Sequence, residues 1–289
     1  MWESREVLAA AVVDYQANWW RHDTDALAVL NDAAAHPGLR GQILATSSLG
    51  QMVTTAAVYR PTHPGAPDDR PYLPERTDIH EGIVEDCVPS AAVAGSGHPS
   101  AYFTIGCPGA GKTSVLRDIV DQHRRRTAPD GRPAPFSVLD ADRVRQSLPE
   151  YADGLGAFVV EEECYFITYG EVFVRAVASR ADMVYDTIGR LSSIRENLGL
   201  LHAEGYEIHV LHARSAVDLC QERTERRALE VDGRLVNPAM LQRAADDAEQ
   251  AIAALIGESF PLAGWAKIDT TEMAVPTLID GTSPWPELL

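Results

Sequence analysis

The segment GCPGAGKTS at positions 106–114 combines glycines, a lysine and hydroxyl side chains in a spacing suited to phosphate chemistry. It contains the pattern G-x-x-x-x-G-K-[ST], which runs from Gly106 through Gly111 and Lys112 to Thr113. In such a loop, backbone N–H groups surround phosphates, the ammonium reaches the β- and γ-phosphates, and the hydroxyl binds Mg²⁺. Lys112 is one of two lysines in a chain that otherwise uses arginine. A compact ammonium fits a phosphate cradle better than the planar fork of arginine.

The residues that flank this loop have the context that the motif requires. Residues 101–106 form a short apolar run typical of a strand, and residues 112–126 have the pattern of an amphipathic helix. A helix N-terminus adds the positive end of its dipole. The same dipole can lower the pKa of a thiol, but we expect Cys107 to be an inert thiol, with a reactive thiolate as the alternative. A chance match would lack this context, so we predict nucleotide binding at Gly106, Cys107, Pro108, Gly109, Ala110, Gly111, Lys112, Thr113 and Ser114.

Two acids, Asp140 and Asp142, close the next apolar run, which we predict to be a strand over residues 136–142. In open parallel sheets, ligands bind beyond the carboxyl ends of the strands. A carboxylate there can accept the proton of a substrate hydroxyl during phosphoryl transfer. We therefore predict that at least one of the two acids is catalytic and that the other faces the substrate. The alternative is that one of them caps the following helix.

A third acid, Asp186, follows the apolar residues 183–185 and resembles the aspartate that holds Mg²⁺ in phosphate-binding folds. We predict Thr113 and Asp186 as the magnesium ligands, with a helix cap as the alternative role for Asp186. An arginine-rich stretch further along the chain suits a movable lid that stabilises transferring charge, or else a solvated face paired with glutamates. Its arginines are Arg223, Arg226, Arg227 and Arg234.

The order of the predicted elements indicates an α/β fold, with a mostly parallel sheet flanked by helices. Strands are predicted at 101–106, 136–142, 182–187, 206–213 and 264–270, and helical patterns alternate with them. We place this kinase-like domain at residues 98–289. Residues 1–97 read as a mostly helical region with helices at 2–20, 24–35 and 76–88 and a proline-rich linker at 60–75.

Composition restricts the class of partner. The chain has 289 residues and a formal net charge of -17, which opposes binding to a nucleic-acid backbone. No apolar run has the length of a membrane span, and the first residues lack the pattern of a signal peptide. The four cysteines are scattered and read as reduced thiols. We therefore expect a cytoplasmic protein that binds neither nucleic acid nor membrane.

Four segments occur in the order found in zeta toxin-like kinases, and the chain resembles that family over roughly residues 78–240. They are GCPGAGKTS, VLDADRVRQSLPEY, VYDTIGR and ERTERR. The resemblance implies a P-loop kinase of the toxin–antitoxin type that uses ATP and Mg²⁺ and phosphorylates the sugar 3′-hydroxyl of a UDP-aminosugar. It assigns Lys112 and Thr113 to the phosphates and metal, and Asp142 to the general base. It matches Arg226, and Arg234 as a second one, to lid arginines that neutralise the transferring phosphoryl group, and it matches Arg190 to the catalytic-site arginine that follows the family's glutamate-glycine-threonine turn.

The chain departs from the family pattern on the acceptor side. Ile188 stands where the family turn has threonine, and Arg175 stands where a helix supplies a substrate-binding glutamate. Glu171, one turn earlier, can take that place. A changed set of polar groups changes which acceptor is recognised. The candidate substrate residues are therefore Asp140, Glu171 and Arg175.

Together these features predict an ATP-dependent kinase that acts on a hydroxyl of a small molecule, with a nucleotide sugar as the first candidate. An antibiotic or metabolite phosphotransferase is the second possibility. A non-catalytic nucleotide-binding regulatory module is the third. The resemblance also implies a protein antitoxin as partner, or self-inhibition by the N-terminal region.

Overall fold

A computed structural model of the chain describes residues 54–60, 72–89, 98–128, 131, 135–154, 156–230, 236, 238–282 and 285. The helices predicted at 2–20 and 24–35, most of the proline-rich linker, and Arg234 lie outside these residues. The chain divides into two compact units. Unit 1 contains the described residues within Met1–Val84, Ala141–Gly170 and Glu225–Leu235, and unit 2 those within Glu85–Asp140, Glu171–Thr224 and Val236–Leu289.

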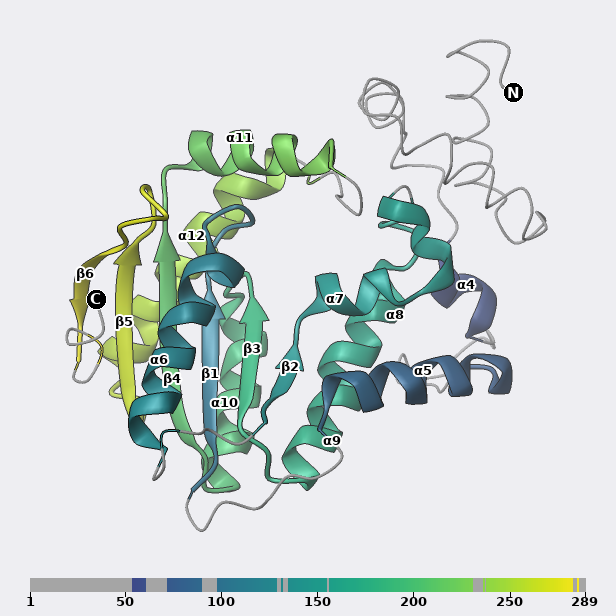
Figure 1. Cartoon of the computed structure of the whole chain (residues 1–289), viewed down its shortest axis with the longest axis horizontal. Coiled ribbons are helices and arrows are strands. Elements are labelled where there is room, and N and C mark those ends of the chain that lie inside the picture. Colours follow the sequence, from purple (N-terminus) through teal and green to yellow (C-terminus); the bar gives the residue numbers. More distant parts are fainter. Residues whose placement is uncertain are drawn as a thin grey trace. The chain divides into compact units, whose positions relative to one another are not determined.

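Unit 2 is built on a sheet in which the described residues form six strands in the order β2-β3-β1-β4-β5-β6 (Figure 1). Pairing is parallel from β2 to β5, and β6 runs antiparallel to β5. This confirms the predicted α/β fold. The strands are β1 (Ser100–Ile105), β2 (Ser137–Leu139), β3 (Met183–Thr187), β4 (Glu207–Arg214), β5 (Gly264–Asp269) and β6 (Thr277–Gly281).

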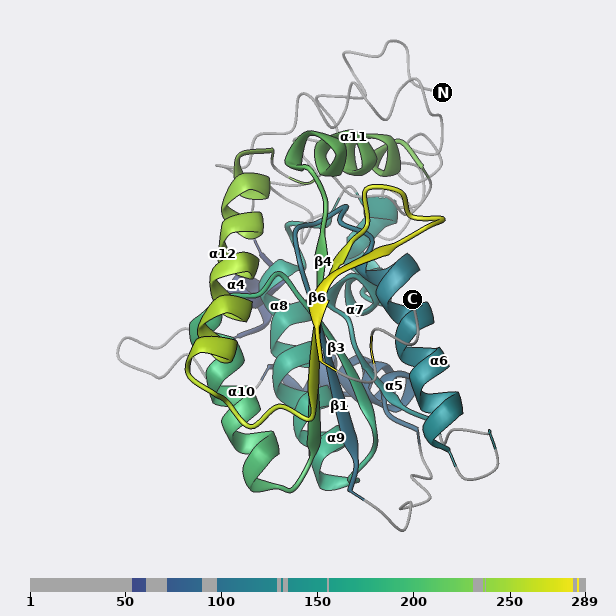
Figure 2. The ribbon, with the colours of Figure 1, turned by 90° about the vertical axis from the view of Figure 1, so that its left-hand side faces the viewer.

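Helices cover both faces of this sheet, which explains why its central strands are apolar on both sides. Figure 2 shows α6 (Arg117–Thr127) on one face and α10 (Leu191–Ala203) and α12 (Pro238–Gly257) on the other. On α12, the residues predicted to pack are all buried at helical spacing: Leu241, Ala244, Ala248, Ile252 and Leu255. The sheet and its helices therefore form a rigid base for the loops at the carboxyl ends of the strands.

Unit 1 is helical in its described part. It contains α4 (Thr55–Tyr59), α7 (Ala141–Gln146), η3 (Pro149–Gly154), α8 (Glu161–Phe166) and most of α5 (Pro74–Cys87). The predicted helix at 76–88 thus begins two residues earlier, because proline suits the first helical turn, where no N–H partner is lost. None of the helices in the described ranges has the length and apolarity of a membrane span.

The structure differs from the predicted elements in several places. The predicted strand at 136–142 is wrong at its end, because β2 stops at Leu139 and α7 begins at Ala141. Asp142 therefore lies in a first helical turn, where a carboxylate interacts well with the helix dipole.

The helix after the glycine loop opens as a π-helix, η2 (Lys112–Leu116), and a second one, η4 (Ile167–Val172), joins α8 to α9 (Phe173–Ala178). Strand β6 was not predicted.

Candidate active site

The glycine loop between β1 and η2 has a backbone that only glycine fits at two points. Gly106 has a φ of 149°, and a Cβ there would lie 2.6 Å from the carbonyl oxygen of Ala213. Gly109 has a φ of 83°, and its Cβ would lie 2.5 Å from the carbonyl oxygen of Cys220. Both contacts are far below a normal van der Waals approach, so the loop packs backbone to backbone against β4 and against α11 (Val217–Ala228).

Lys112 points into this loop. Its Nζ donates hydrogen bonds to the carbonyl oxygens of Gly106, at 2.8 Å, and Cys107, at 3.2 Å. Both acceptors belong to the turn that the sequence predicts to surround a phosphate. Thr113 and Ser114 follow in the first turn of η2 with exposed side chains. The structure therefore places one mobile cation and two hydroxyls around a single backbone turn.

Neighbouring side chains hold the outer side of the loop. The Thr270 hydroxyl lies 2.6 Å from the Ala110 carbonyl oxygen. Arg223 donates from Nη1 to the Gly109 carbonyl oxygen at 3.2 Å, and from Nη2 to the Thr271 carbonyl oxygen at 2.7 Å. Arg223 was predicted as part of a movable lid, but these bonds tie it to the loop and to the segment after β5. Its role in the structure is to fix the loop from outside.

A partly buried charge cluster lies at the ends of β2 and β3. Asp186 faces Thr104 across the β1–β3 pairing, and the Thr104 hydroxyl donates to Oδ1 of Asp186. Arg117 Nη2 lies 3.2 Å from Oδ2 of Asp186 and 3.7 Å from Oδ2 of Asp140. Asp186 does not cap α10, since Arg190 is the N-cap residue there. Arg117, which sequence reasoning missed, thus bridges two predicted site carboxylates.

Burial, together with the charge of Asp140, raises the pKa of Asp186 to about 6 against the opposing charges of Arg117 and Lys112. A divalent cation would favour the ionised form, because it supplies the positive charge that burial demands. Among the described residues, no group of three His, Cys, Asp or Glu side chains has the arrangement of a complete metal site. Mg²⁺, however, binds through one or two carboxylates together with phosphate oxygens and water. The oxygen donors of Asp140, Asp186 and Thr113 fit that pattern.

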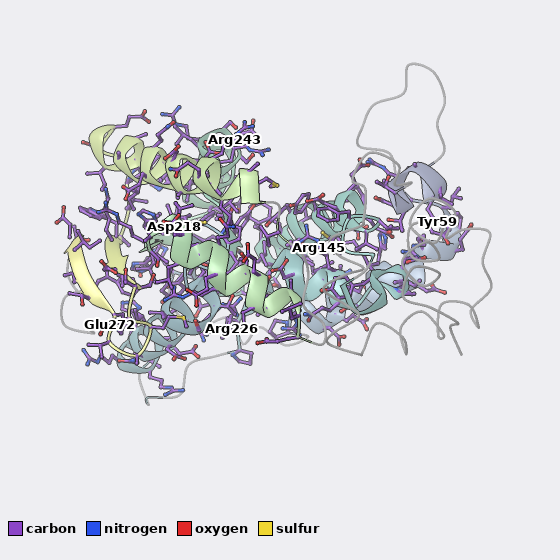
Figure 3. The ribbon with its side chains drawn as sticks, turned by 90° about the horizontal axis from the view of Figure 1, so that it is seen from above. Tyr59, Arg145, Asp218, Arg226, Arg243 and Glu272 are labelled. Carbon is purple, nitrogen blue, oxygen red and sulfur yellow. The ribbon has the colours of Figure 1, made fainter. Side chains whose placement is uncertain are left out.

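In unit 1, Asp142 is held by two arginines. Arg145 Nη1 donates to its Oδ1 at 2.7 Å, and Arg227 Nη2 lies 3.4 Å from its Oδ2. Arg226, the arginine that sequence reasoning selected, is exposed on α11 (Figure 3). Neither contact is recognisable from the sequence, although Arg145 lies three residues after Asp142, a spacing that brings side chains together on a helix.

The remaining predicted residues differ in burial. Arg190 is exposed at the start of α10, and Arg175 is exposed on α9, whereas Glu171 in η4 is half-buried. Cys107 is buried, and its pKa is raised by a hydrogen bond with Cys220 and by burial. The structure therefore supports an inert thiol at Cys107 and not a reactive thiolate.

Comparisons with known proteins agree with this fold. The family model described as Zeta toxin matches residues 89–261, which is more than half of the chain. Among solved structures, the AvrRxo1-ORF1:-ORF2 complex with ATP matches with a TM-score of 0.61 and 14% identity over 82% of this chain and 81% of that chain. The structure of the PezAT chromosomal toxin–antitoxin system of Streptococcus pneumoniae has a TM-score of 0.54 and 12% identity, covering 77% of this chain and 89% of that chain. At these identities the likeness shows the fold. No curated protein sequence matches the chain.

Proposed function

This chain belongs to the Zeta toxin family, and we propose that it is an ATP-dependent kinase that transfers the γ-phosphoryl group to a hydroxyl of a small molecule. One observation carries the proposal. The Lys112 ammonium lies inside a loop whose glycine backbone is closed to side chains at Gly106 and Gly109. Such a turn presents N–H groups and one point charge, which is the recognition pattern for nucleotide phosphates.

Unit 2 supplies the donor side of the proposed reaction. Lys112 binds the β- and γ-phosphates and follows the charge that develops on the transferring group. Thr113 and Asp186 are the residues that would hold Mg²⁺, which neutralises phosphate charge when bound, and Asp140 shares the Arg117 guanidinium with Asp186. Arg117 keeps the two carboxylates together through its guanidinium. The loop residues from Gly106 to Ser114 contact the nucleotide.

Asp142 is the proposed general base. Its carboxylate accepts the proton of the acceptor hydroxyl, so that the oxygen attacks the γ-phosphorus as its negative charge develops. Arg226 and Arg234 are assigned to neutralising the transferring phosphoryl group, and Arg190 to the catalytic site, on the family pattern. Arg227 is not assigned a chemical role, although it contacts Asp142.

The acceptor is proposed from the family pattern and from two departures from it. A nucleotide sugar such as a UDP-aminosugar is the first candidate on the family pattern, with Asp140, Glu171 and Arg175 as substrate residues. Ile188 and Arg175 replace the polar groups expected there, which favours a different acceptor, for example an antibiotic or an anionic metabolite. An arginine fork pairs well with a carboxylate or a phosphate. The half-buried Glu171 is the alternative contact.

A protein partner is also part of the proposal. The similar solved structures include a two-component complex and a toxin–antitoxin system. We propose a protein antitoxin for this chain, with self-inhibition by the N-terminal region as the alternative. Co-expression with the product of an adjacent reading frame, followed by a pull-down, distinguishes them. A stable complex supports the antitoxin, whereas activation on removal of residues 1–53 supports self-inhibition.

The direct test is a mass measurement. The protein is incubated with ATP–Mg²⁺ and a panel of nucleotide sugars, antibiotics and anionic alcohols, and products are examined for the gain of one phosphoryl group. Asp142→Asn serves as the control, because it is expected to bind ATP and to lose turnover. ATP binding without transfer to any acceptor, and without effect of Asp142→Asn, would instead indicate a nucleotide-binding regulatory module.

A further inference from the structure

The two arginines that hold Asp142 differ in burial. The side chain of Arg145 is 3% exposed, whereas that of Arg227 is 51% exposed. Arg145 makes the shorter contact, at 2.7 Å to Oδ1, and Arg227 the longer one, at 3.4 Å to Oδ2. A buried, charge-assisted bond of this length is geometrically strict, while an exposed pair at 3.4 Å exchanges readily with water. The two oxygens of Asp142 are therefore held unequally.

Arg145 is itself fixed from a second direction. Its Nη2 lies 3.3 Å from Oε1 of Glu161, and its guanidinium carbon lies 5.3 Å from the centre of the Tyr165 ring. The Tyr165 hydroxyl donates to the same glutamate oxygen at 3.1 Å. The planar fork of Arg145 thus connects the first turn of α7 to the first turn of α8, with an aromatic ring beside it. A side chain bound on both ends has little freedom to rotate.

The two oxygens of Asp142 differ in how firmly these arginines hold them. Oδ1 is committed to the buried fork of Arg145, whereas Oδ2 has the exposed Arg227 contact. The helix α7 has only six residues, so its own hydrogen bonds give its first turn limited rigidity. The link through Arg145 to Glu161 supplies the rigidity that α7 lacks. The direction of the Asp142 carboxylate is consequently determined by Arg145.

We propose that Arg145 is a positioning residue for the phosphoryl-transfer reaction: it holds Oδ1 of Asp142 and thereby fixes the direction of the carboxylate that accepts the proton of the acceptor hydroxyl. The proposal rests on the proposed function, in which Asp142 is the base. It adds that the buried arginine of α7 acts only through Asp142. Arg145 contacts neither nucleotide nor acceptor in this assignment. Its loss therefore changes the rate of transfer and leaves nucleotide affinity unchanged.

The test compares kcat and KM for ATP in Arg145→Met, Arg145→Lys and a matched control, Arg143→Met, which removes an exposed arginine from the same helix. Misplacing a reacting group by about 1 Å costs on the order of 100-fold. We expect Arg145→Met to lower kcat by roughly 30- to 100-fold at unchanged KM for ATP. Lysine keeps the charge without the fork, so Arg145→Lys recovers part of the loss. Arg143→Met stays within about threefold of the unmodified protein, as surface ion pairs contribute little.

A second measurement separates positioning from general damage. Arg145→Met is repeated in the Asp142→Asn background, where a residue that acts through Asp142 has nothing left to position. We expect no further loss of rate there, because effects within one functional group are not additive. A full additional loss in that background overturns the inference.

The two proposals fail in different ways. If Asp142→Asn keeps its activity, the assignment of the base is wrong. If Asp142→Asn is inactive and Arg145→Met stays within threefold of the unmodified protein, only the role of Arg145 is wrong. If Arg145→Met does not fold, the kcat values of Glu161→Gln and Arg145→Lys are compared with that of the unmodified protein instead. Values within threefold for both variants show that the role of Arg145 is wrong. Glu161→Gln leaves the arginine in place without its anchor and is expected to lower kcat to a value between those of Arg143→Met and Arg145→Lys.

Discussion

Replacing Arg76 with methionine removes a guanidinium that joins two buried glutamates in unit 1. Arg76 donates to both oxygens of Glu163, each at 2.8 Å, and to both oxygens of Glu150, at 2.9 and 3.0 Å. The exposed fraction is 4% for the Arg76 side chain, 0% for Glu163 and 10% for Glu150. His80 Nε2 also lies 2.8 Å from Glu163. Methionine fills a similar volume but leaves two carboxylates without their main partner.

The cost follows from the burial of the carboxylates. Burial alone would raise the pKa of Glu163, but hydrogen bonds from His80 and Arg76 outweigh it and leave that pKa below its ordinary value. Removing one partner of a buried ion pair typically costs about 3–5 kcal/mol, because the other charge stays buried and uncompensated. We expect Arg76→Met to lose about that much stability, which corresponds to a fall in Tm of roughly 10 °C for a chain of this size.

Urea unfolding followed by circular dichroism measures the loss, with Arg125→Met as a control that removes an exposed arginine from α6. The triple variant Arg76→Met, Glu150→Gln, Glu163→Gln is expected to regain more than half of the lost stability, since it leaves no buried charge. A loss below about 1 kcal/mol in Arg76→Met would refute the reasoning, because that is the range of exposed ion pairs. Arg76 precedes the family match at residues 89–261, so a large loss also shows that α5 is needed by the matched part.

Three further predictions follow from single side chains. Lys112→Ala is expected to abolish turnover in the phosphoryl-transfer assay, because it removes the charge that follows the γ-phosphate; weaker ATP binding at an unchanged maximal rate would contradict that role. Asp142→Asn is expected to lower kcat by roughly 10²- to 10⁴-fold with little change in ATP affinity, and more than Asp140→Asn does; a loss under about tenfold would leave Asp142 without a catalytic role. Burial and the charge of His123 lower the pKa of His209 to about 3, so the unfolded state binds more protons below about pH 6.5 and stability falls with decreasing pH. His209→Phe is expected to remove about 2 kcal/mol of the loss between pH 7 and pH 5 in urea unfolding, and an unchanged pH dependence would contradict the shift.

The sequence predicts the fold well where the pattern is local. Strand β1, the glycine loop and the following helix are recognisable because an apolar run, three glycines and an amphipathic segment are adjacent in the chain. The parallel sheet follows from apolar strands separated by helices long enough to cross over. Strand β6 escapes prediction because its residues are mostly exposed or half-buried and carry no apolar alternation. Its position depends on pairing with β5, which is a tertiary contact.

The candidate site is less predictable, because its partners come from distant positions. Arg117 and Asp186 are 69 residues apart in the chain, and Arg227 and Asp142 are 85 apart. An arginine-rich segment next to glutamates predicts equally well a solvated face and a functional one. The register of a single helix decides that Arg227, not Arg226, contacts Asp142. The Arg145 side chain is buried and the Arg227 side chain is exposed. The spacing of residues along the chain predicts neither property.

The strong negative charge of the chain is compatible with binding an anionic nucleotide because the charges at the loop are paired locally. In unit 2, Lys112 and Arg223 bond the carbonyl oxygens of the loop, and Arg117 lies between Asp140 and Asp186. Each buried carboxylate near the loop therefore has a cation or a hydroxyl beside it. A ligand inside the turn feels N–H groups and an ammonium within a few ångströms, whereas exposed surface charges beyond about 10 Å are screened by salt. The net charge of -17 governs which macromolecules the surface repels, and the loop geometry governs which small anion is bound.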